Sequence, residues 1–295
     1  MDNRISRKNY TLIASMLFGL FFGAGNLIFP IIMGAKAGTN VVPALIGMLV
    51  TAVGIPLLGI IAMGISRSEG LLDMANRVSR PYSRFFTCAL YLTIGPLFAI
   101  PRCAATSFTV GVTPLVTGSA TLAQEIFTTV FFVLALYFSL KPSKIMDSVG
   151  KLLNPIFLVL LSVLIVAAMV RPVQTVSSVP AIEGYVDNAF FSGFLQGYDT
   201  LDALACLAFG IIVINVIRGL GVKEPGAIAR STVKSGVFSM AIMAVIYAFI
   251  ALAGAQCYGL YADRLTEPGF TGGDIFAIIS RHYFGSVGGI LLALT

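Results

Sequence analysis

Two clusters of small and polar residues interrupt long apolar stretches of this chain. The first is Gly23, Ala24, Gly25 and Asn26, inside the uncharged run 9–35. At bilayer depth, a backbone group freed from a helix is costly unless a partner satisfies it. Free N–H groups at the positive end of a half-helix attract a carboxylate, whereas free carbonyls and an Asn oxygen hold a small cation. The cluster therefore predicts a broken membrane helix that binds solutes.

The second cluster places Asp199 and Asp202 inside the apolar stretch 189–217. An ionisable residue at membrane depth costs roughly 2.5 to 3.5 kcal/mol on insertion scales, which makes it a functional hypothesis. In one interpretation, a helix unwound at Gly197 and Tyr198 restarts with Asp199 as its cap, and Asp202 reaches back from the third position. In the other, Asp202 binds a cation or a proton. Both stay open for Asp202, whereas capping or solvent contact is expected for Asp199.

Two further polar residues admit two roles each. Asn26 is either an interhelical hydrogen-bonding residue or a cation ligand, and its place after a loosened Gly-Ala-Gly backbone favours the ligand role. Arg102 follows a long uncharged stretch. An arginine at the end of a span can extend its head group to the interface, so we expect anchoring at the outer surface rather than gating.

The composition excludes an ordinary soluble domain. Hydrophobic residues make up 57% of the chain and charged residues only 11%, whereas about a quarter of the residues of a soluble domain are charged. A net charge of +6 is explained by basic loops between apolar spans, so nucleic acid is not expected as a partner. The four cysteines and the single histidine lack the spacing of a metal site.

Seven segments reach or nearly reach the roughly 20 apolar residues that a bilayer crossing requires. They are 10–34, 42–65, 85–105, 122–140, 152–170, 189–217 and 237–258. Short surface helices are expected at 69–78 and 272–283. Most of the 19 Lys and Arg residues fall in loops on one side, which places the N-terminus in the cytoplasm.

The two interrupted spans occupy corresponding positions in a repeated architecture. They are the first and the sixth predicted spans, and an odd number of spans per repeat inverts the second copy. We therefore expect one transmembrane transporter domain over 1–295, with a first five-span repeat at 10–170 and the start of an inverted repeat at 189–295. An eighth apolar run begins near residue 286 and ends after about ten residues, half of the hydrocarbon thickness. It predicts that the chain is part of a longer protein.

Four sequence motifs then resemble one known family. They are FGLFFGAGNLIFP in the first span, the following MGAKAG, IPRCAATSFTVGVTP in the third span and GYDTLDALACLAFGI in the sixth. Together they resemble the bacterial branched-chain amino acid:cation symporter family along essentially the whole chain. The resemblance implies an all-α polytopic membrane protein with the LeuT-type five-plus-five inverted-repeat fold, discontinuous first and sixth helices, and an N-terminal fragment truncated within the eighth span.

The resemblance also implies site residues in the first span. The backbone of Gly23, Ala24 and Gly25 would hold the substrate carboxylate, and Asn26 would hold a cation. The carbonyls of two residues match positions that contribute to a second cation site in sodium-coupled relatives. These two residues are Gly19 and Phe22.

In the sixth span the family pattern is matched by Gly197, Tyr198, Thr200 and Asp202. The carboxylate of Asp199 departs from that pattern, and so does Leu201, where Met is common. Aromatic side chains would receive the apolar tail of the substrate. They include Phe21, Phe22 and Tyr198.

The sequence thus predicts secondary active uptake of leucine, isoleucine and valine, with Na⁺ or H⁺ as the coupling cation and no other cofactor. The expected setting is the bacterial plasma (inner) membrane, with membrane lipid and small-molecule substrate as partners and no obligate protein partner. Two alternatives come from other classes. One is a membrane-embedded, Mg²⁺-dependent prenyltransferase-like enzyme that uses Asp199 and Asp202, and the other is an uncoupled channel. A non-enzymatic symporter is preferred because one Asp-x-x-Asp offers too few acidic ligands.

Overall fold

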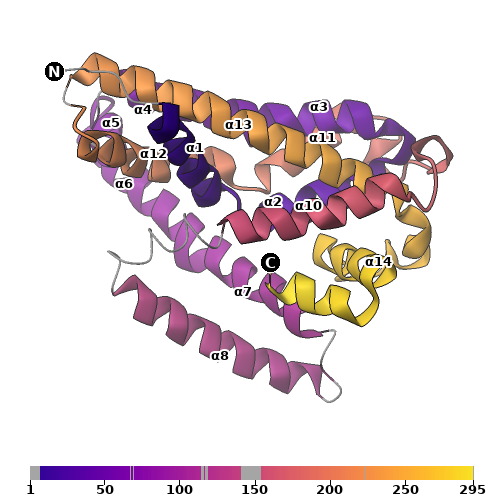
Figure 1. Ribbon diagram of the computed structural model, residues 1–295. Coiled ribbons are helices and arrows are strands. Elements are labelled where there is room, and N and C mark those ends of the chain that lie inside the picture. The colour runs from indigo at the N-terminus through magenta and orange to yellow at the C-terminus, as the bar shows by residue number, and fades with distance from the viewer. Residues whose placement is uncertain are drawn as a thin grey trace.

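Helices form the regular structure of the described residues (Figure 1). The computed structural model describes residues 7–294, except 67, 69, 114, 115, 117, 118, 141–153 and 223, and no strand occurs in this part. Within these described residues, five helical stretches are long and apolar enough to cross a membrane. They are Ala24–Ser66, Arg80–Val112, Ala120–Ser139, Asp202–Gly219 and Pro225–Gln256, and Ile156–Val170 is a shorter apolar helix. The prediction of an all-α polytopic membrane protein is confirmed.

The first predicted span is formed by helices α1 (Arg7–Phe21) and α2 (Ala24–Ala37). Between them the N–H of Phe22 still donates to the carbonyl of Phe18 at 2.7 Å. Gly23 then has the extended backbone angles φ −119° and ψ −171°. The chain therefore leaves helical geometry at the glycine-rich cluster and starts a new helix immediately after it.

The second predicted span consists of α3 (Val41–Leu49), a π-helical turn at Val50–Gly54 and α4 (Ile55–Ser66). Gly38 turns the chain between α2 and α3 with a φ of +50°. A side chain there would also lie 2.5 Å from the carbonyl oxygen of Val179. Glycine satisfies both requirements because it has no Cβ.

The third predicted span is kinked. Its elements are α6 (Arg80–Leu92), a π turn at Thr93–Leu97, α7 (Ala99–Ser107) and a second π turn at Phe108–Val112, and the short helix α5 (Leu71–Asn76) precedes them. Helix α5 corresponds to the surface helix expected at 69–78. Gly95 has non-helical angles and precedes Pro96, and Phe98 also leaves the helical region. This kink sets the direction of α7.

Helices α8 (Ala120–Ser139) and α10 (Asn154–Val170) correspond to the fourth and fifth predicted spans. Figure 1 shows α8 at the edge of the molecule, where it packs on α7. None of its residues is buried, and Leu136 is 64% exposed. Helix α10 packs against α13 and α14.

The sixth predicted span is formed by α11 (Ala189–Tyr198) and α12 (Asp202–Gly219). Leu201 connects them in the left-handed conformation, with a φ of 66°. No side chain caps α12, so the capping alternative is wrong for both aspartates, whereas Asp199 is exposed, as its other alternative of solvent contact predicts. The physical reason is that the left-handed residue delays the restart until Asp202, which becomes the first residue of the helix instead of the third.

Helix α13 (Pro225–Gln256) begins twelve residues before the expected boundary of 237. Glu224 caps it by accepting from the N–H groups of Gly226 and Ala227 at 3.0 and 2.8 Å, and Pro225 occupies the first turn. The helix packs against α1, α2, α4, α10 and α12. Short 3₁₀ turns at Tyr258–Leu260 and Ala262–Arg264 lead to α14 (Gly272–Leu294), which is interrupted at Gly285. The expected surface helix at 272–283 occupies its first part.

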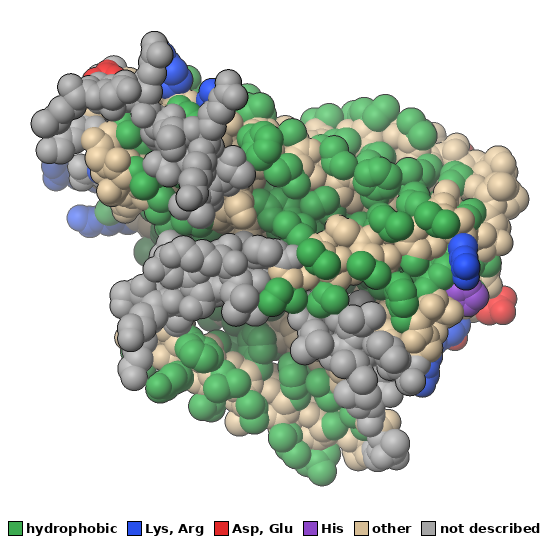
Figure 2. All heavy atoms as spheres, viewed as in Figure 1, with side chains coloured by type: hydrophobic (Ala, Val, Ile, Leu, Met, Phe, Trp, Pro, Cys, Tyr) green, Lys and Arg blue, Asp and Glu red, His purple; other side chains and the backbone are tan. Residues whose placement is uncertain are grey.

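The exterior of the molecule is largely apolar. Figure 2 shows hydrophobic side chains across the middle of one face and basic side chains toward its two ends. The buried core lies between α1, α2, α3, α4, α12 and α13, and a second cluster joins α2, α10, α13 and α14. An apolar surface around a packed helical core fits a lipid environment.

Candidate functional site

A buried hydrogen-bonded cluster joins the two interruptions. The side-chain nitrogen of Asn26 donates to Oδ2 of Asp202 at 2.7 Å. The hydroxyl of Tyr247 donates to the same oxygen at 2.8 Å, and Asn26 also donates to that hydroxyl. The exposed fractions of Asn26, Asp202 and Tyr247 are 2%, 2% and 0%. Side chains from α2, α12 and α13 thus meet on one carboxylate.

Local backbone structure fixes the direction of both partners. Asn26 is the third residue of α2, and its side-chain oxygen accepts from the N–H of Gly23 at 3.0 Å. This contact turns its NH₂ group toward Asp202. Asp202 is the first residue of α12, where the helix dipole favours a negative side chain. Its N–H donates to the hydroxyl of Thr200 at 3.4 Å, which holds the new helix onto the interrupted segment.

These contacts decide part of what the sequence left open. Asn26 makes an interhelical hydrogen bond, and Asp202 acts as its acceptor rather than as a helix cap. A cation-ligand role for either residue stays a prediction. Carboxylate and carbonyl oxygens are the ligands that hard cations prefer. The carboxylate of Asp202 lies in this cluster, whereas the amide oxygen of Asn26 accepts from the N–H of Gly23.

Arg102 lies at the interruptions. Its Nη1 donates to the backbone carbonyl of Asp199, and its Nη2 donates to that of Thr200 at 3.4 Å. The guanidinium carbon lies 5.1 Å from the ring centre of Phe29 and 5.3 Å from that of Phe98. The kinked third span directs the side chain of Arg102 to the carbonyls that end α11. Its anchoring at the outer interface stays a prediction.

The first-span glycine cluster lies against this arginine. A Cβ on Gly25 would be 2.8 Å from Nη2 of Arg102 and 3.4 Å from the ring of Phe29. Gly25 is buried, Ala24 is half-buried and Gly23 is exposed. The structure therefore brings the start of α2 next to the interruption in the sixth span.

Within the sixth span, Gly197 contacts the second span directly. A Cβ there would be 1.9 Å from the hydroxyl oxygen of Thr51 and 2.7 Å from the carbonyl oxygen of Met48. Thr51 in turn donates to the carbonyl of Phe194 at 2.8 Å. Gly197 thus allows close packing of α11 on α3, a role that the sequence interpretation did not include.

The remaining sixth-span positions differ in exposure. Thr200 is buried, and its hydroxyl donates to the carbonyl of Gly197 at 2.8 Å. Tyr198 is 43% exposed, and its ring lies edge-on to that of Phe194 at 5.5 Å. Thr200 therefore stabilises the segment between α11 and α12 through its hydrogen bond, whereas the ring of Tyr198 is accessible to solvent.

The aromatic residues of the first span occupy separate contacts. Phe21 is buried and lies edge-on to Phe209, with ring centres 6.0 Å apart. Phe22 stacks on Phe18 at 4.9 Å and lies 6.3 Å from the ring of Tyr247. The rings of Phe21, Phe22 and Tyr198 therefore do not stack on one another. Gly19 is half-buried in the last turns of α1.

The two aspartates do not act as a pair. The carboxylate of Asp199 is exposed and accepts from the side chain of Gln196 at 3.0 Å, whereas that of Asp202 faces Asn26 and Tyr247. Among the described residues, no group of three or more His, Cys, Asp or Glu side chains could hold a metal ion. This arrangement gives no support to a Mg²⁺–diphosphate site on Asp199 and Asp202.

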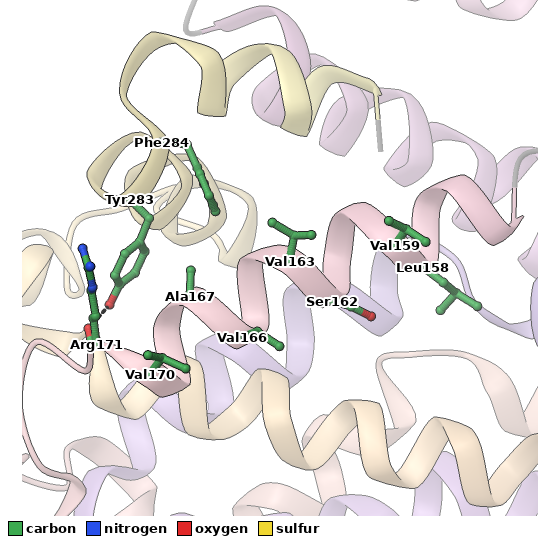
Figure 3. Close-up of a pocket in the computed structure, with 10 residues that line it drawn as sticks. All are labelled: Leu158, Val159, Ser162, Val163, Val166, Ala167, Val170, Arg171, Tyr283 and Phe284. Atoms are coloured by element: carbon green, nitrogen blue, oxygen red, sulfur yellow. Dashed lines mark hydrogen bonds between the residues drawn. The ribbon is translucent and has the colours of Figure 1, made fainter.

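A separate groove lies along α10, with a volume of about 650 Å³ (Figure 3). Valine and alanine side chains of α10 form one wall, and Tyr283 and Phe284 of α14 face them. The hydroxyl of Tyr283 donates to the carbonyl of Arg171 at 2.5 Å and closes one end. None of the site residues predicted from sequence lines this groove.

Sequence reasoning missed Tyr247 and the contacts of Arg102. Tyr247 is a single phenol within an apolar span, and a buried hydroxyl needs a partner. That requirement was the only available signal. The kink at Gly95 and Pro96 was visible, but its effect on the direction of Arg102 depends on packing between helices.

Comparison with known proteins identifies the family. The family described as "Branched-chain amino acid transport protein" matches residues 6–295. The chain is 46% identical over 299 residues to the branched-chain amino acid permease BrnQ of Lactobacillus delbrueckii subsp. lactis, covering 100% of this chain and 65% of that relative. It is 42% identical over 297 residues to BrnQ of Bacillus subtilis, covering 100% of this chain and 66% of the relative.

BraB of Bacillus subtilis, also named a branched-chain amino acid permease, is 40% identical over 295 residues, which cover 99% of this chain and 64% of BraB. The chain therefore spans slightly less than two thirds of the curated relatives described above. These proteins are transport permeases and not enzymes, as the sequence predicted. With a match over nearly its whole length, the chain belongs to the branched-chain amino acid transport protein family.

Proposed function

We propose that the protein takes up leucine, isoleucine and valine across the bacterial plasma membrane by symport with Na⁺ or H⁺. Family membership and the names of the relatives support the substrate class. The observation that carries the site is the 2.7 Å contact between Asn26 and Asp202. It joins the interruption of the first predicted span to that of the sixth.

The proposed architecture is a LeuT-type inverted repeat. Helices α1 and α2 would be the two halves of one discontinuous span, and α11 and α12 the halves of its counterpart. The first repeat would run over 10–170 and the second would start at 189, with the N-terminus in the cytoplasm. Half-helix ends at the bilayer midplane supply free N–H and C=O groups to solutes.

In this proposal the coupling cation binds at Asn26 and Asp202, next to the hydroxyl of Tyr247. The backbone of Gly23, Ala24 and Gly25 faces the substrate carboxylate. A cation that binds Asp202 changes the hydrogen bonds between α2, α12 and α13. It can drive a conformational change only to the extent that it binds one state more tightly than the other.

The remaining predicted residues would surround these two ligands. From the sixth span they are Gly197, Tyr198 and Thr200, with the exposed Tyr198 ring toward the apolar tail and Phe21 behind the first-span cluster. The carbonyls of Gly19 and Phe22 would contribute to a second cation site. Discrimination among the three substrates would be modest, because one methylene in an apolar pocket is worth only about 1 to 3 kcal/mol.

The energy for uptake would come from the inward cation gradient. At a membrane potential of about 100 mV, one inward charge supplies about 2.3 kcal/mol. That energy permits roughly fifty-fold accumulation before any chemical gradient is counted. An uncoupled channel, the remaining alternative, would equilibrate leucine and could not accumulate it.

The test is uptake of labelled leucine by the complete protein in proteoliposomes, with sodium and proton gradients imposed separately. We expect accumulation above the external concentration with at least one inward cation gradient, and its loss when an ionophore dissipates that gradient. Protein-free liposomes are the control. Equilibration without accumulation under every gradient would indicate a channel and would overturn the symport proposal.

A further inference from the structure

The guanidinium of Arg102 touches both interruptions at once. Its Nη1 and Nη2 donate to the backbone carbonyls of Asp199 and Thr200. On the side of the first span, Nη2 lies 2.8 Å from the point that a Cβ on Gly25 would occupy. The third predicted span thus places the guanidinium of Arg102 between the first and sixth predicted spans, at the start of α2 and the end of α11.

Two aromatic rings fix the position of this cation. Phe29 lies one turn after Gly25 on α2, and Phe98 lies at the kink that precedes α7. The guanidinium carbon is 5.1 and 5.3 Å from their ring centres. Cation–π contacts of this kind orient the planar group as well as attract it.

Arg102 has no ion-pair partner among the residues that the structure describes. The nearby carboxylate of Asp199 meets Gln196, and that of Asp202 meets Asn26 and Tyr247. The two carbonyl contacts use two of the five N–H groups of the guanidinium. A cation inside a membrane protein that has donors left over is a hypothesis for binding an anionic group.

We propose that Arg102 binds the carboxylate of the amino acid substrate and so makes that carboxylate a requirement for recognition. This assignment rests on the proposed function. The N–H groups not used by the two carbonyls supply the donors, and the fork geometry of a guanidinium suits a carboxylate with two parallel hydrogen bonds. The position next to Gly25 is where the substrate carboxylate is expected from the first-span cluster.

The experiment compares leucine with isopentylamine, which is leucine without its carboxylate. Wild-type protein, Arg102→Gln and Arg102→Lys are reconstituted as complete chains. The KM of leucine uptake and the concentration of isopentylamine that halves it are measured. We expect Arg102→Gln to raise the KM of leucine about 10- to 100-fold, because losing a hydrogen bond to a charged group typically weakens binding by that factor. The half-inhibiting concentration of the amine should stay unchanged.

Arg102→Lys keeps the charge but loses the fork, so its KM should lie between those of the wild type and Arg102→Gln. The matched control is Arg264→Gln. Arg264 also lies over an aromatic ring, 5.1 Å from the centre of Phe270, but it pairs with Glu267 away from the interruptions. The Arg264→Gln variant should leave the KM of leucine and the half-inhibiting concentration of isopentylamine unchanged.

A purely structural role would give a different result. Arg102→Gln could lower the maximal rate or the amount of folded protein and leave the ratio of the leucine KM to the half-inhibiting amine concentration at its wild-type value. That result would overturn the carboxylate assignment. If the wild-type protein does not transport leucine at all, the proposed function is overturned, and this assignment with it. The two failures are therefore distinguishable.

Discussion

The side-chain amide nitrogen of Asn26 lies 2.7 Å from a carboxylate oxygen of Asp202, although 176 residues separate them in sequence. Each residue stands at the start of a helix that follows an interruption, and Tyr247 of α13 donates to the same carboxylate. One buried acceptor therefore connects two half-helices and the long central helix. Binding of a ligand to this carboxylate would therefore change the contacts of α2, α12 and α13 together.

Asp202→Asn should separate leucine exchange from leucine accumulation. The amide keeps the size of the side chain and can still accept from Asn26 and Tyr247, but it lacks the charge that binds a cation. Exchange of labelled for unlabelled leucine should persist, whereas accumulation driven by a cation gradient should fall at least tenfold. Asp199→Asn is the control, because that exposed carboxylate accepts from the side chain of Gln196 and does not contact Asn26 or Tyr247. An Asp202→Asn protein with wild-type dependence on sodium and pH would exclude Asp202 from coupling.

Tyr247→Phe should change cation binding without removing the ring from the core. The hydroxyl donates to Asp202 at 2.8 Å, and the side chain is fully buried. One hydrogen bond to a charged group is worth about 1.5 to 3 kcal/mol, so its loss should shift the half-saturating cation concentration about 10- to 100-fold, and toward tighter binding if the cation is a proton. Titration of the coupling cation in the uptake assay measures this.

The control for Tyr247→Phe is Tyr261→Phe. Tyr261 is equally buried, and its hydroxyl donates to the carbonyl of Gly254. This variant should lower thermal stability but leave the cation dependence as in the wild type. Equal cation dependence in both tyrosine variants would mean that Tyr247 is only a packing residue.

Substitutions in the glycine cluster should have graded effects on uptake. A Cβ at Gly23 meets only Asn26 Oδ1 at 3.8 Å, an ordinary contact, whereas one at Gly25 approaches Nη2 of Arg102 to 2.8 Å. Gly23→Ala should therefore be close to wild type. Gly25→Ala should raise the KM of leucine because the flexible arginine must move, and Gly25→Leu should abolish uptake. Wild-type uptake by Gly25→Leu would contradict the placement of the site.

Gly197→Ala should destabilise the protein. Its new methyl group would lie 1.9 Å from the hydroxyl oxygen of Thr51 and 2.7 Å from the carbonyl oxygen of Met48. Overpacking of this kind typically costs about 1 to 3 kcal/mol. A lower thermal unfolding temperature in detergent measures it. Gly219→Ala is the control, because nothing lies within 4 Å of its Cβ position. That variant should be neutral or slightly stabilising, since alanine is the better helix former.

The approximate positions of the helix ends could be predicted because their cause is local, but the expected unwinding at Gly197 and Tyr198 is wrong, since both residues stay in α11. Glycines and buried polar residues in an apolar run favour a departure from helical geometry, and α1 and α11 end at Phe21 and Tyr198. The first residue of α13 was harder to predict from the sequence. Its first turns are polar enough to resemble a loop, but Glu224 and Pro225 start the helix there.

The contacts of the site were less predictable because they depend on tertiary structure. A helix cap by Asp199 fits the spacing to Asp202, but one left-handed residue, Leu201, shifts the start of α12 and removes it. The inward direction of Arg102 follows from the kink at Gly95, and Tyr247 reaches Asp202 only because α13 crosses both interrupted spans. No local sequence pattern predicts the contact of Arg102 with α11 or that of Tyr247 with Asp202.

The most direct test is an experimental structure of the complete protein with leucine bound. We predict leucine between Gly25 and Thr200, its carboxylate at the start of α2, and helices interrupted before Ala24 and after Tyr198. Leucine bound elsewhere, for example in the groove of α10 and α14, would contradict this, and so would helices that run unbroken through Gly23 or Thr200.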